Sequence, residues 1–512
     1  MAGQFILGID AGTSLIKTVV FDLQGQELGA SSRKAELESP HSGWFQQDMR
    51  TVWEATTTTI KEAVQNSGIN PADIAVIGPT GQGDGAWMVD QHGEPVAPAP
   101  LWNDGRAGEI VARWEADGVL SAVFKRGGTV LWPGAQAAIL AWMRENEPRI
   151  FERISTVFCC KDWIKLKLTG TLSTDETDGS IPFMAMASRA YDDEQMRLLG
   201  LADICDKLPP VRQSHQIVGT VTAEAANLTG LKEGTPVVSG MIDVAASAVG
   251  IGVIDAGQSF SIIGTTALNA IVLDKPILEP DNVGATICHS VPGRWMRVLG
   301  SMAGTPNLDW YIANMGEIFK TEADQTGSDV FGLLEEAILQ VPVGSGGLIF
   351  HPYLQGERAP FLNPNARAGM YGISADTTRA HLARSVYEGV ALSIRDCFEN
   401  IGSGVTTVML SGGGANSAAW CQILADATNC TMSVPAGTQF GTLGAALAGA
   451  VGVGLFDSYA SAAQQAVRIA RTYQPDPHNV QRYNELYSLY RDLIERMGPF
   501  WAARHKFVEG NA

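Results

Sequence analysis

The sequence predicts an α/β protein with mixed sheets, built from two domains that begin with related β-hairpins. Apolar strands alternate with amphipathic helices along the chain, which is typical of the α/β class. A hairpin pattern near the N-terminus recurs in the middle of the chain. The length of 512 residues also exceeds that of one typical domain.

The repeated hairpin is the most informative of these observations. Residues 6–22 read ILGIDAGTSLIKTVVFD, and residues 262–274 read IIGTTALNAIVLD. When the copies are aligned on Gly12 and Gly264, each has an apolar strand, the sequence Gly-Thr-(Ser/Thr), and a second apolar strand that ends in Asp. Each copy therefore predicts a β-hairpin with a turn of small residues. The alternative is a chance likeness between two ordinary hairpins.

The two turns are candidate phosphate-binding sites. Glycine lets a ligand approach the backbone closely, and hydroxyl and free N–H groups can hold phosphate oxygens. The motifs of P-loop sites, dinucleotide-binding folds and HExxH zinc enzymes do not occur in the sequence. The predicted phosphate ligands are Gly12, Thr13 and Ser14 in the first turn and Gly264, Thr265 and Thr266 in the second.

The other elements follow from hydrophobic periodicity. Met49, Trp53, Ile60 and Val64 mark one face of a helix, which precedes the strand Ile74–Gly78. The further predicted elements are the strand Val237–Ile242, the helix Val244–Val249, the strand Thr407–Ser411, the loop Gly412–Asn416, the helix Ser417–Thr428, a buried helix within Thr442–Phe456 and two closing helices within Ser458–Arg504.

Two residues beside the first turn are candidates for the nucleotide site. Asp10 ends the first strand, where a carboxylate can hold a Mg²⁺ ion that carries nucleotide phosphates. A turn-forming Asp that binds local N–H groups is an equally good interpretation. Lys17, on the returning strand, can reach a phosphate, although a solvated lysine on a strand face is the more common case.

Asp243 is the best candidate for a catalytic base. It follows a strand and precedes a helix within the sequence GMIDVAAS, so a helix N-cap is the simplest interpretation. Phosphoryl transfer to a hydroxyl, however, requires a carboxylate that accepts the proton of the attacking group. Asp243 lies between the two hairpins in the sequence, which favours this role.

A glycine-rich segment of the second half is a candidate for nucleoside binding. Residues 411–420 read SGGGANSAAW, which predicts a strand, a turn and a helix. Gly412 and Gly413 let the backbone pass under a flat ligand, and Asn416 offers polar contacts to its edge. An ordinary glycine-rich turn is the alternative.

Polar and aromatic residues of the first half are typical of a polyol site. Carboxylates and amides bind hydroxyls in pairs, and flat aromatic rings cover C–H faces. Core packing is the more common role of any single tryptophan. The candidates are Gln82 and Asp84 in PTGQGDGAW, Trp102, Asn103, Asp104 and Arg106 in LWNDGR, and Trp44, Trp132 and Trp163 as walls.

The composition excludes several classes of protein. The net charge of −18, without a basic patch, argues against a partner such as nucleic acid or an anionic membrane. The N-terminus has no basic region typical of a signal peptide, and no apolar run is long enough to span a bilayer. Seven scattered cysteines without a C-x-x-C pair indicate neither a disulfide framework nor a zinc site. We expect a soluble cytoplasmic protein.

Several ordered motifs resemble the FGGY family of carbohydrate kinases over essentially the whole chain. They are GIDAGTSLIK, GWFQQD, LWNDGR, CKDWIKLKLTG, GMIDVAAS, SIIGTT, YLQGERAPFLNPNARAGMYGI, LSGGGANSAAWCQILAD and GTLGAA. The resemblance implies an actin-like ATPase (ribonuclease H-like) fold, in which two related domains surround a nucleotide cleft and close on ATP. These domains would span residues 1–250 and 251–512. Dimers are common among similar kinases, so the resemblance makes a homodimer one candidate assembly, although the sequence itself does not determine the oligomeric state.

The resemblance also implies roles for the candidate residues. The catalytic base would be Asp243, and Asp10 would lie on the Mg²⁺ side, with Asp243 close enough to share the ion. ATP phosphates would bind the two turns and Lys17. The adenosine loop would include Gly412, Gly413 and Asn416. The sugar pocket would be lined by Gln82, Asp84, Asp104 and Asp243, with Trp44 and Trp132 as walls.

One loop departs from two branches of the family. Glycerol kinases carry Arg-Glu and xylulose kinases carry Met-His at the position of Gly83 and Asp84. The GQGDG-aromatic pattern looks most like erythritol kinases, followed by kinases of L-xylulose. We therefore expect a kinase of a four- or five-carbon polyol or ketose, with erythritol as the first candidate and L-xylulose or D-xylulose as alternatives. An actin-like ATPase or a sugar-sensing protein without kinase activity is the alternative from another class.

Overall fold

The computed structural model describes residues 4–402 and 404–510, and it divides into two compact units. Unit 1 contains the chain up to Ala256 together with Val272–Met296 and Gly437–Arg468. Unit 2 contains Gly257–Ile271, Arg297–Ala436 and the chain from Ile469. Each unit is thus assembled from segments that are far apart in the sequence. The division into residues 1–250 and 251–512 stays a prediction.

A mixed sheet forms the centre of unit 1. Its strands run in the order β13-β14-β5-β1-β2-β3, and β15 also pairs with β5. Strand β1 is antiparallel to β2 and parallel to β5, and β15 is parallel to the end of β5. The strands are β1 Phe5–Ala11, β2 Leu15–Asp22, β3 Glu27–Lys34, β5 Ile74–Gly81, β13 Ile217–Thr220, β14 Pro236–Val238 and β15 Met241–Ile242.

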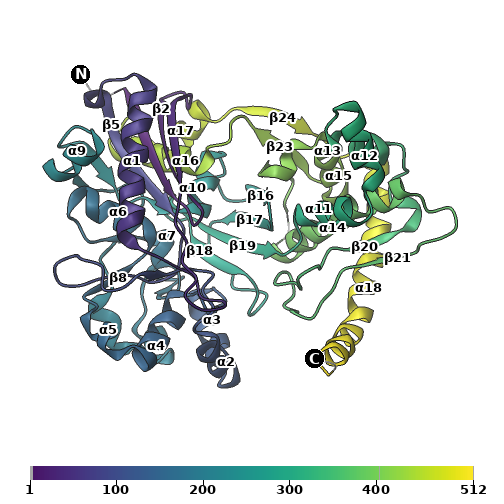
Figure 1. Cartoon of the computed structure of the whole chain (residues 1–512), viewed down its shortest axis with the longest axis horizontal. Helices are drawn as coiled ribbons and strands as arrows, with labels where there is room; N and C mark the ends of the chain where they lie inside the picture. Colours follow the sequence, from purple (N-terminus) through teal and green to yellow (C-terminus); the bar gives the residue numbers. More distant parts are fainter. Residues whose placement is uncertain (1–3, 403, 511–512) are drawn as a thin grey trace. The chain divides into compact units, whose positions relative to one another are not determined.

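Helices cover both faces of this sheet, as can be followed in Figure 1. Helices α1 (Met49–Ser67), α6 (Cys160–Thr169) and α9 (Ala223–Thr229) belong to one layer, and α10 (Asp243–Gly250) packs with α16 (Phe440–Gly452) in the other. The further helices of the unit are α2 Gly108–Ala116, α3 Val119–Gly127, α4 Gln136–Asn146, α5 Pro148–Arg153, α7 Glu176–Gly179, α8 Asp193–Leu198 and α17 Tyr459–Ala466.

Short strands complete unit 1. They form two-stranded ladders outside the central sheet, except for β18 (Ala285–Cys288). The pairs are β4 Gln46–Gln47 with β7 Ala99–Pro100, β6 Trp87–Val89 with β8 Thr156–Phe158, β9 Thr174–Asp175 with β12 Val211–Arg212, and β10 Met184–Ala185 with β11 Ala190–Tyr191.

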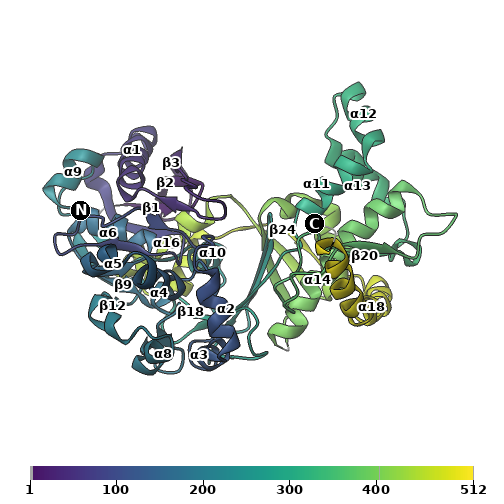
Figure 2. The ribbon, with the colours of Figure 1, turned by 60° about the horizontal axis from the view of Figure 1, so that its bottom comes forward.

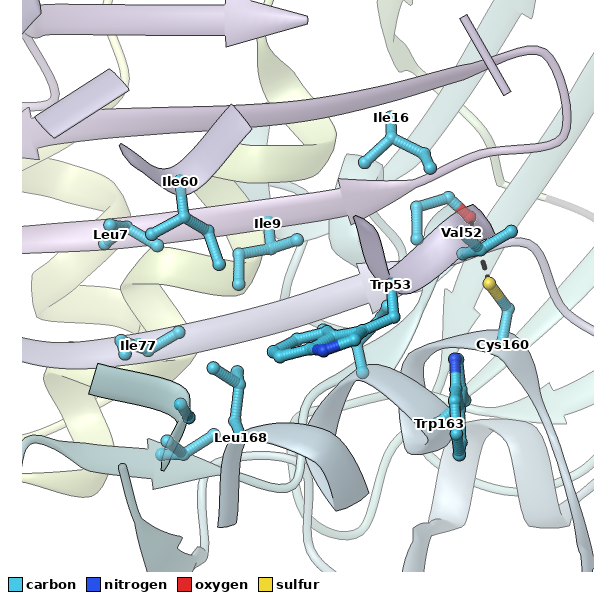
Figure 3. Packing of buried hydrophobic residues seen from close by; sticks show 14 of the residues in the cluster. Leu7, Ile9, Ile16, Val52, Trp53, Ile60, Ile77, Cys160, Trp163 and Leu168 are labelled. Carbon is cyan, nitrogen blue, oxygen red and sulfur yellow. Dashed lines mark hydrogen bonds between the residues drawn. The ribbon is translucent and has the colours of Figure 1, made fainter. Parts of the chain in front are cut away.

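The main core of unit 1 lies between the sheet and the layer of α1 and α6. Figure 3 shows Leu7, Ile9 and Ile77 of the sheet beside the ring of Trp53 from α1. Trp163 of α6 is buried in the same cluster and donates its indole N–H to the Met49 carbonyl at 2.6 Å. The predicted helical face of α1 is thereby confirmed, whereas Trp163 packs in the core and is no wall of a ligand pocket.

Helix α16 lies unusually close to the sheet and to α10. A Cβ on Gly8 of β1 would lie 2.0 Å from the Thr442 carbonyl oxygen. A Cβ on Gly444 of α16 would lie 1.9 Å from the Ala246 carbonyl oxygen in α10. Real Cβ atoms do not come so near a backbone oxygen, so only glycine fits at these contacts. The buried helix expected from the small-residue run is confirmed, and it brings a late segment of the chain beside β1.

Unit 2 is built around a second mixed sheet with helices on it, as Figure 2 also shows. The strands run in the order β19-β17-β16-β22-β23-β24, and β20 (Ile349–His351) pairs with β21 (Gly369–Tyr371) outside it. The sheet strands are β16 Ser259–Ile263, β17 Ala267–Leu273, β19 Trp295–Ser301, β22 Thr407–Ser411, β23 Thr431–Pro435 and β24 Ile469–Tyr473. The helices are α11 Pro306–Asn314, α12 Glu317–Thr326, α13 Val330–Leu339, α14 Arg379–Ile401, α15 Ala418–Thr428 and α18 Pro477–Glu509.

Both predicted hairpins are present. In unit 1, Asp10 of β1 lies opposite Lys17 of β2. In unit 2, Ile263 of β16 lies opposite Ala267 of β17. In both units the first strand of the hairpin also pairs in parallel with a later strand, β5 or β22, so the repeat extends beyond the hairpin itself.

One element prediction was wrong and another was incomplete. The strand expected over Val237–Ile242 is broken into β14 and β15, because Gly240 takes the left-handed backbone conformation with φ of 77°. The two closing helices are present as α17 and α18, but the sequence did not predict β24, which lies between them and pairs antiparallel with β23. The pattern IARTY gave no strong strand signal, and the ladder with β23 decides its conformation. Among the described residues, no helix is long and apolar enough to cross a membrane.

Candidate active site

The C-terminal ends of three neighbouring strands bring the acidic candidates of unit 1 together. Asp10 of β1 pairs in register with Thr80 of β5, and Ile242 of β15 pairs with Gly81, the last residue of β5. Asp243 follows Ile242 directly and begins α10. The strand ends of an open α/β sheet are the usual place for a ligand site.

Asp243 does not cap its helix in the way the simplest interpretation predicts. Ile242 occupies the N-cap position, and Asp243 is the first residue of α10. Its Oδ1 atom accepts the N–H of the adjacent Val244 at 2.6 Å. The side chain remains exposed to solvent, so a ligand can reach the carboxylate.

The electrostatic surroundings of the two carboxylates raise their pKa values. Although the Asp243 side chain is exposed, the protein packed around it displaces part of its hydration and, with the negative charges of Asp10 and Asp178, raises its pKa to about 7. Burial raises the pKa of Asp10 to about 6, although Lys17 opposes this shift. Asp243 can therefore exchange a proton near neutral pH, as a general base must.

The start of α16 lies beside Asp10. A Cβ on Gly441 would lie 3.0 Å from the Asp10 Oδ2 atom and 3.9 Å from the Ser247 Oγ atom of α10. The N-terminus of a helix carries free N–H groups and a partial positive charge, which favour anions. This end of unit 1 therefore offers carboxylates for a cation and helix termini for phosphate oxygens.

The first turn is connected to the predicted polyol residues by a continuous set of hydrogen bonds. The Gly12 N–H donates to the Leu15 carbonyl at 3.1 Å and closes the turn. The Thr13 hydroxyl donates to Gln82 Oε1 at 2.9 Å and accepts the Trp102 indole N–H at 2.9 Å. Thr13, predicted as a phosphate ligand, thus also holds Gln82 and Trp102 in place.

Gln47 completes this set and was missed by the sequence analysis. It accepts the Gln82 amide at 2.8 Å and donates to the Thr13 carbonyl at 3.0 Å. The motif GWFQQD contains Gln47, but nothing in the motif distinguishes it from Gln46. The side chain of Gln82 is thereby fixed in orientation, with its amide between two partners.

Asp84 lies two residues beyond Gln82 in a strained position. Its backbone is left-handed, with φ of 55°, and the residue is only 7% exposed. Its Oδ1 atom is buried and makes no hydrogen bond among the described residues. Desolvation, Asp178 and Asp243 raise the pKa of Asp84 well above its ordinary range. An unpartnered buried carboxylate is costly, which points to a partner outside the chain.

Asp104 is fully engaged by protein donors. Its carboxylate binds the Arg106 guanidinium, with Nε 2.8 Å from Oδ1 and Nη2 3.0 Å from Oδ2, and the Phe45 N–H lies 2.7 Å from Oδ2. The Arg106 guanidinium in turn stacks 4.4 Å over the Trp44 ring. The contacts of Asp104 and Trp44 in the structure hold the loop 101–106 in shape.

Trp132 also contacts this loop. It is half-buried and donates its indole N–H to the Trp102 carbonyl at 2.5 Å. Trp102 itself is 40% exposed while hydrogen-bonded to Thr13. Trp102 therefore presents the more accessible ring, and the motif LWNDGR had already drawn attention to it.

The structure also gathers the nucleotide candidates of unit 2. The Thr305 N–H and hydroxyl both donate to the Gly264 carbonyl, at 2.8 and 3.1 Å. These two hydrogen bonds stabilise the conformation of the second turn. Gly412, with φ of 85°, lies against this turn, since a Cβ there would be 2.5 Å from the Ile263 carbonyl oxygen. Arg471 holds the following segment by donating to the Ala415 carbonyl at 2.7 Å. The loop Gly412–Asn416 and the turn Gly264–Thr266 are neighbours in unit 2.

A buried ionic cluster behind Asp243 was missed by the sequence analysis. Lys161 of α6 is inaccessible to solvent and lies 2.7 to 3.0 Å from carboxylate oxygens of Asp162, Asp175 and Asp178. Asp175 also accepts the Thr177 hydroxyl at 3.0 Å. That hydroxyl in turn accepts the N–H of Ile242 at 2.8 Å. The cluster fixes the backbone immediately before Asp243.

A cavity beside this cluster is too small for a sugar. Its volume is about 10 Å³, which has room for about one water molecule, and its lining includes Asp178, Cys159 and Thr174. Among the described residues, no group of three or more His, Cys, Asp or Glu side chains is arranged to hold a metal ion by itself.

Comparison with known proteins identifies the family. The model of the N-terminal domain of the FGGY family of carbohydrate kinases matches residues 5–250, and that of the C-terminal domain matches residues 260–453. An L-xylulose/3-keto-L-gulonate kinase of Escherichia coli is 32% identical, with 98% of each chain covered. An erythritol kinase of Brucella abortus is also 32% identical, with 98% of this chain and 97% of the relative covered.

A solved structure has the same architecture over nearly the whole length. The xylulose kinase of Rhodospirillum rubrum superposes with a TM-score of 0.88 at 28% identity, covering 97% of this chain and all of that chain. The fold is the actin-like ATPase fold of such kinases. The chain therefore belongs to the FGGY family of carbohydrate kinases, which are phosphotransferases with an alcohol group as acceptor.

Proposed function

We propose that the protein transfers the γ-phosphoryl group of ATP to a hydroxyl of a four- or five-carbon polyol or ketose, with erythritol as the first candidate. The main support for the proposal is the position and the raised pKa of the Asp243 carboxylate. Its carboxylate is accessible at the start of α10 and has a pKa of about 7, set by the surrounding protein and by Asp10. A base of this strength can accept a hydroxyl proton near neutral pH.

In the proposed reaction, the acceptor hydroxyl lies against Asp243. Its oxygen forms a bond to the γ-phosphorus while the bond from that phosphorus to the bridging oxygen of ADP breaks. The hydroxyl proton passes to the Asp243 carboxylate. Positioning and electrostatic stabilisation supply most of the acceleration in such reactions, and the base adds about 10²–10⁴-fold.

The residues around Asp10 fit the Mg²⁺ ion that accompanies ATP. Mg²⁺ in nucleotide sites is usually held by one or two carboxylates together with phosphates and water, and Asp10 and Asp243 are such carboxylates with raised pKa values. We assign Asp10 to the ion, with Asp243 nearby. When bound, the ion would neutralise charge on the phosphate oxygens.

The remaining nucleotide contacts are proposed from the two turns. We propose that main-chain N–H groups and hydroxyls of the turns bind phosphate oxygens, and that the glycine-rich loop of unit 2 binds adenosine. The residues are Gly12, Thr13, Ser14 and Lys17 in unit 1, and Gly264, Thr265, Thr266, Gly412, Gly413 and Asn416 in unit 2.

The acceptor contacts are proposed from unit 1. Gln82, oriented by Thr13 and Gln47, and Asp84, with its unpartnered oxygen, would bind hydroxyl groups. We propose that Asp104 and Trp44 act as positioning residues, because the Asp104 carboxylate is already occupied by protein donors. Trp132 would support the ring of Trp102.

Two observations favour particular substrates: the similarity to named relatives and the sequence of the loop with Gly83 and Asp84. Relatives named for erythritol and for L-xylulose and 3-keto-L-gulonate are equally similar to this chain, so both classes are candidates. The loop with Gly83 and Asp84 differs from the pattern of glycerol and xylulose kinases and looks most like that of erythritol kinases. Erythritol therefore comes first, and L-xylulose and D-xylulose follow.

The test is ADP release with MgATP over erythritol, glycerol, L-xylulose, D-xylulose, D-ribulose, xylitol and ribitol. We expect one four- or five-carbon compound to be used with a kcat/KM well above the others. ADP release that is indifferent to every compound would favour an ATPase without a sugar acceptor and would contradict the proposal. Binding of a polyol without ADP formation would favour a sugar-sensing protein instead.

A further inference from the structure

Asp84 is a buried acidic group that takes no part in the proposed transfer of the proton or the phosphoryl group. It is 7% exposed, and its Oδ1 atom lacks a hydrogen-bond partner among the described residues. The strained backbone, with φ of 55°, holds it in this position. A buried carboxyl oxygen without a hydrogen-bond partner lowers the stability of the protein, so such a group next to a ligand site is a good candidate for controlling which ligand binds.

The charges that act on Asp84 and on Asp243 are all negative. Asp178 and Asp243 raise the pKa of Asp84, and Asp10 and Asp178 raise the pKa of Asp243. Asp178 is itself buried, with an unpartnered Oδ1 atom. Above the pKa values of Asp178 and Asp243, both about 7, these carboxylates make the potential around the proposed acceptor site of unit 1 negative.

The two buried lysines of α6, Lys161 and Lys165, already form ion pairs with carboxylates of the protein. Lys161 lies within 3.0 Å of oxygens of Asp162, Asp175 and Asp178. Lys165 lies 2.8 Å from Asp162. Neither ammonium group is accessible to solvent. They offset part of the negative charge from behind but leave no donor for an anionic ligand.

The loop also has no room for a side chain, and hence for a basic one, at position 83 next to Asp84. A Cβ on Gly83 would lie 2.2 Å from the Ile242 Cδ1 atom and 3.3 Å from the Asp178 Oδ1 atom. A longer side chain at position 83 would displace Ile242, the residue before Asp243. Glycine at this position therefore leaves Asp84 and Asp178 without a positive neighbour from the loop.

We infer that the acceptor site takes uncharged polyols or ketoses and rejects sugar acids, with Asp84 and Asp178 as the residues that determine this choice. The inference rests on the proposed kinase function and deepens it. Hydroxyl groups of a neutral sugar can donate hydrogen bonds to carboxylates, so they relieve the unpartnered oxygens. A sugar acid instead brings a further negative charge, and like charges placed together cost several kcal/mol.

The test compares neutral and acidic compounds of matched size at pH 8. At this pH the carboxyls of Asp178 and Asp243, each with a pKa of about 7, are ionised. The pairs are erythritol with erythronate, and L-xylulose with 3-keto-L-gulonate. We expect kcat/KM for the neutral member of the preferred pair to exceed that for the acid by about 100-fold or more. Calorimetric binding of each compound without ATP should show the same order, and this measurement does not need turnover.

Two variants assign the discrimination to its residues. Asp84→Asn should reduce the ratio of neutral to acid kcat/KM by about tenfold or more, because it replaces the carboxyl group by an amide of the same shape that can donate hydrogen bonds to an anionic ligand. Asp178→Asn should act in the same direction. Asp73→Asn is the control, because it removes an exposed carboxylate of the same unit that lies before the start of β5, whereas the proposed site lies at the other end of this strand. The ratio in this control should stay close to that of the parent protein.

The outcomes of the two proposals can be told apart. Equal or better use of the acids, or tighter binding of the acids, would overturn the inference while leaving the kinase function intact. Unchanged discrimination in Asp84→Asn would exclude Asp84 as a determinant of the choice between neutral and acidic acceptors. Absence of ADP release with every compound would contradict the kinase proposal, and the binding order would still decide whether the site excludes acids.

Discussion

At the scale of single residues, the proposed reaction depends on the carboxylates of Asp10 and Asp243, whose pKa values the surrounding protein raises to about 6 and about 7. Asp10 and Asp243 could be selected because each ends a strand next to a small-residue segment, and the structure brings both to adjacent strand ends. Gln47, Lys161 and Asp178 could not be selected in this way. Their roles depend on contacts between segments far apart in the sequence, such as Lys161 with Asp175 and Asp178. The two lysines and the aspartate among the apolar residues of the CKDWIKL segment were the one available signal.

The protonation state of Asp243 predicts how kcat/KM depends on pH. Asp243 must be deprotonated to accept a proton, so kcat/KM should rise with pH, reach half its maximum near pH 7 and then level off. Asp178→Asn should move the midpoint to lower pH, because the charge of Asp178 raises the pKa of Asp243. The measurement is a pH–rate profile from pH 5.5 to 9 at saturating MgATP. A flat profile over this range would argue against Asp243 as the base.

At the scale of elements, regular patterns were predictable and the breaks in them were not. The hairpins and β22 have the bounds or turns that the sequence predicts, because their apolar alternation is long. The break between β14 and β15 depends on Gly240, whose Cβ would lie 2.0 Å from the Pro79 carbonyl oxygen. Strand β24 forms because β23 offers it a partner. Such tertiary causes leave little trace in the local sequence.

The close packing of α16 gives a stability prediction. Gly444→Ala would place a methyl group where the Ala246 carbonyl lies, so we expect a loss of about 3 kcal/mol or more in the free energy of unfolding. Gly498→Ala is the matched control, because this helical glycine of α18 has open space around it. The control should be neutral or stabilising by up to about 1 kcal/mol. Urea unfolding followed by tryptophan fluorescence measures both, and equal stabilities would contradict the packing described for α16.

At the scale of the whole molecule, the sequence predicted two related halves but not how the chain is divided between them. The repeated hairpins identify one sheet in each unit. The return of Gly437–Arg468 to unit 1 could not be predicted from these hairpins, because it depends on how α16 fits against β1, β5 and α10. The expected closure of two domains on a nucleotide stays a prediction. Each unit also contains a buried histidine, which affects the stability of the molecule in acid.

Buried His351 in unit 2 predicts part of the acid sensitivity. Burial lowers its pKa to about 4, below the ordinary 6.5, so the unfolded chain binds a proton more readily than the folded one as the pH falls below 6.5. Between pH 7.5 and 5 this difference costs about 2 kcal/mol of stability. His351→Gln should reduce the pH dependence of the unfolding free energy by about this amount, whereas exposed His478→Gln should not. Identical pH dependence in the His351 variant and the parent protein would contradict this explanation.

The most direct test of the central claim is the steady-state kinetics of Asp243→Asn with the best acceptor of the panel. We expect kcat to fall by about 10²–10⁴-fold, because the proton acceptor is lost, while the affinity for MgATP changes little. Asp329→Asn, an equivalent change at the exposed N-cap residue of helix α13, should leave kcat unchanged. Near-normal turnover in Asp243→Asn would contradict the assignment of Asp243 as the base on which the proposed reaction depends.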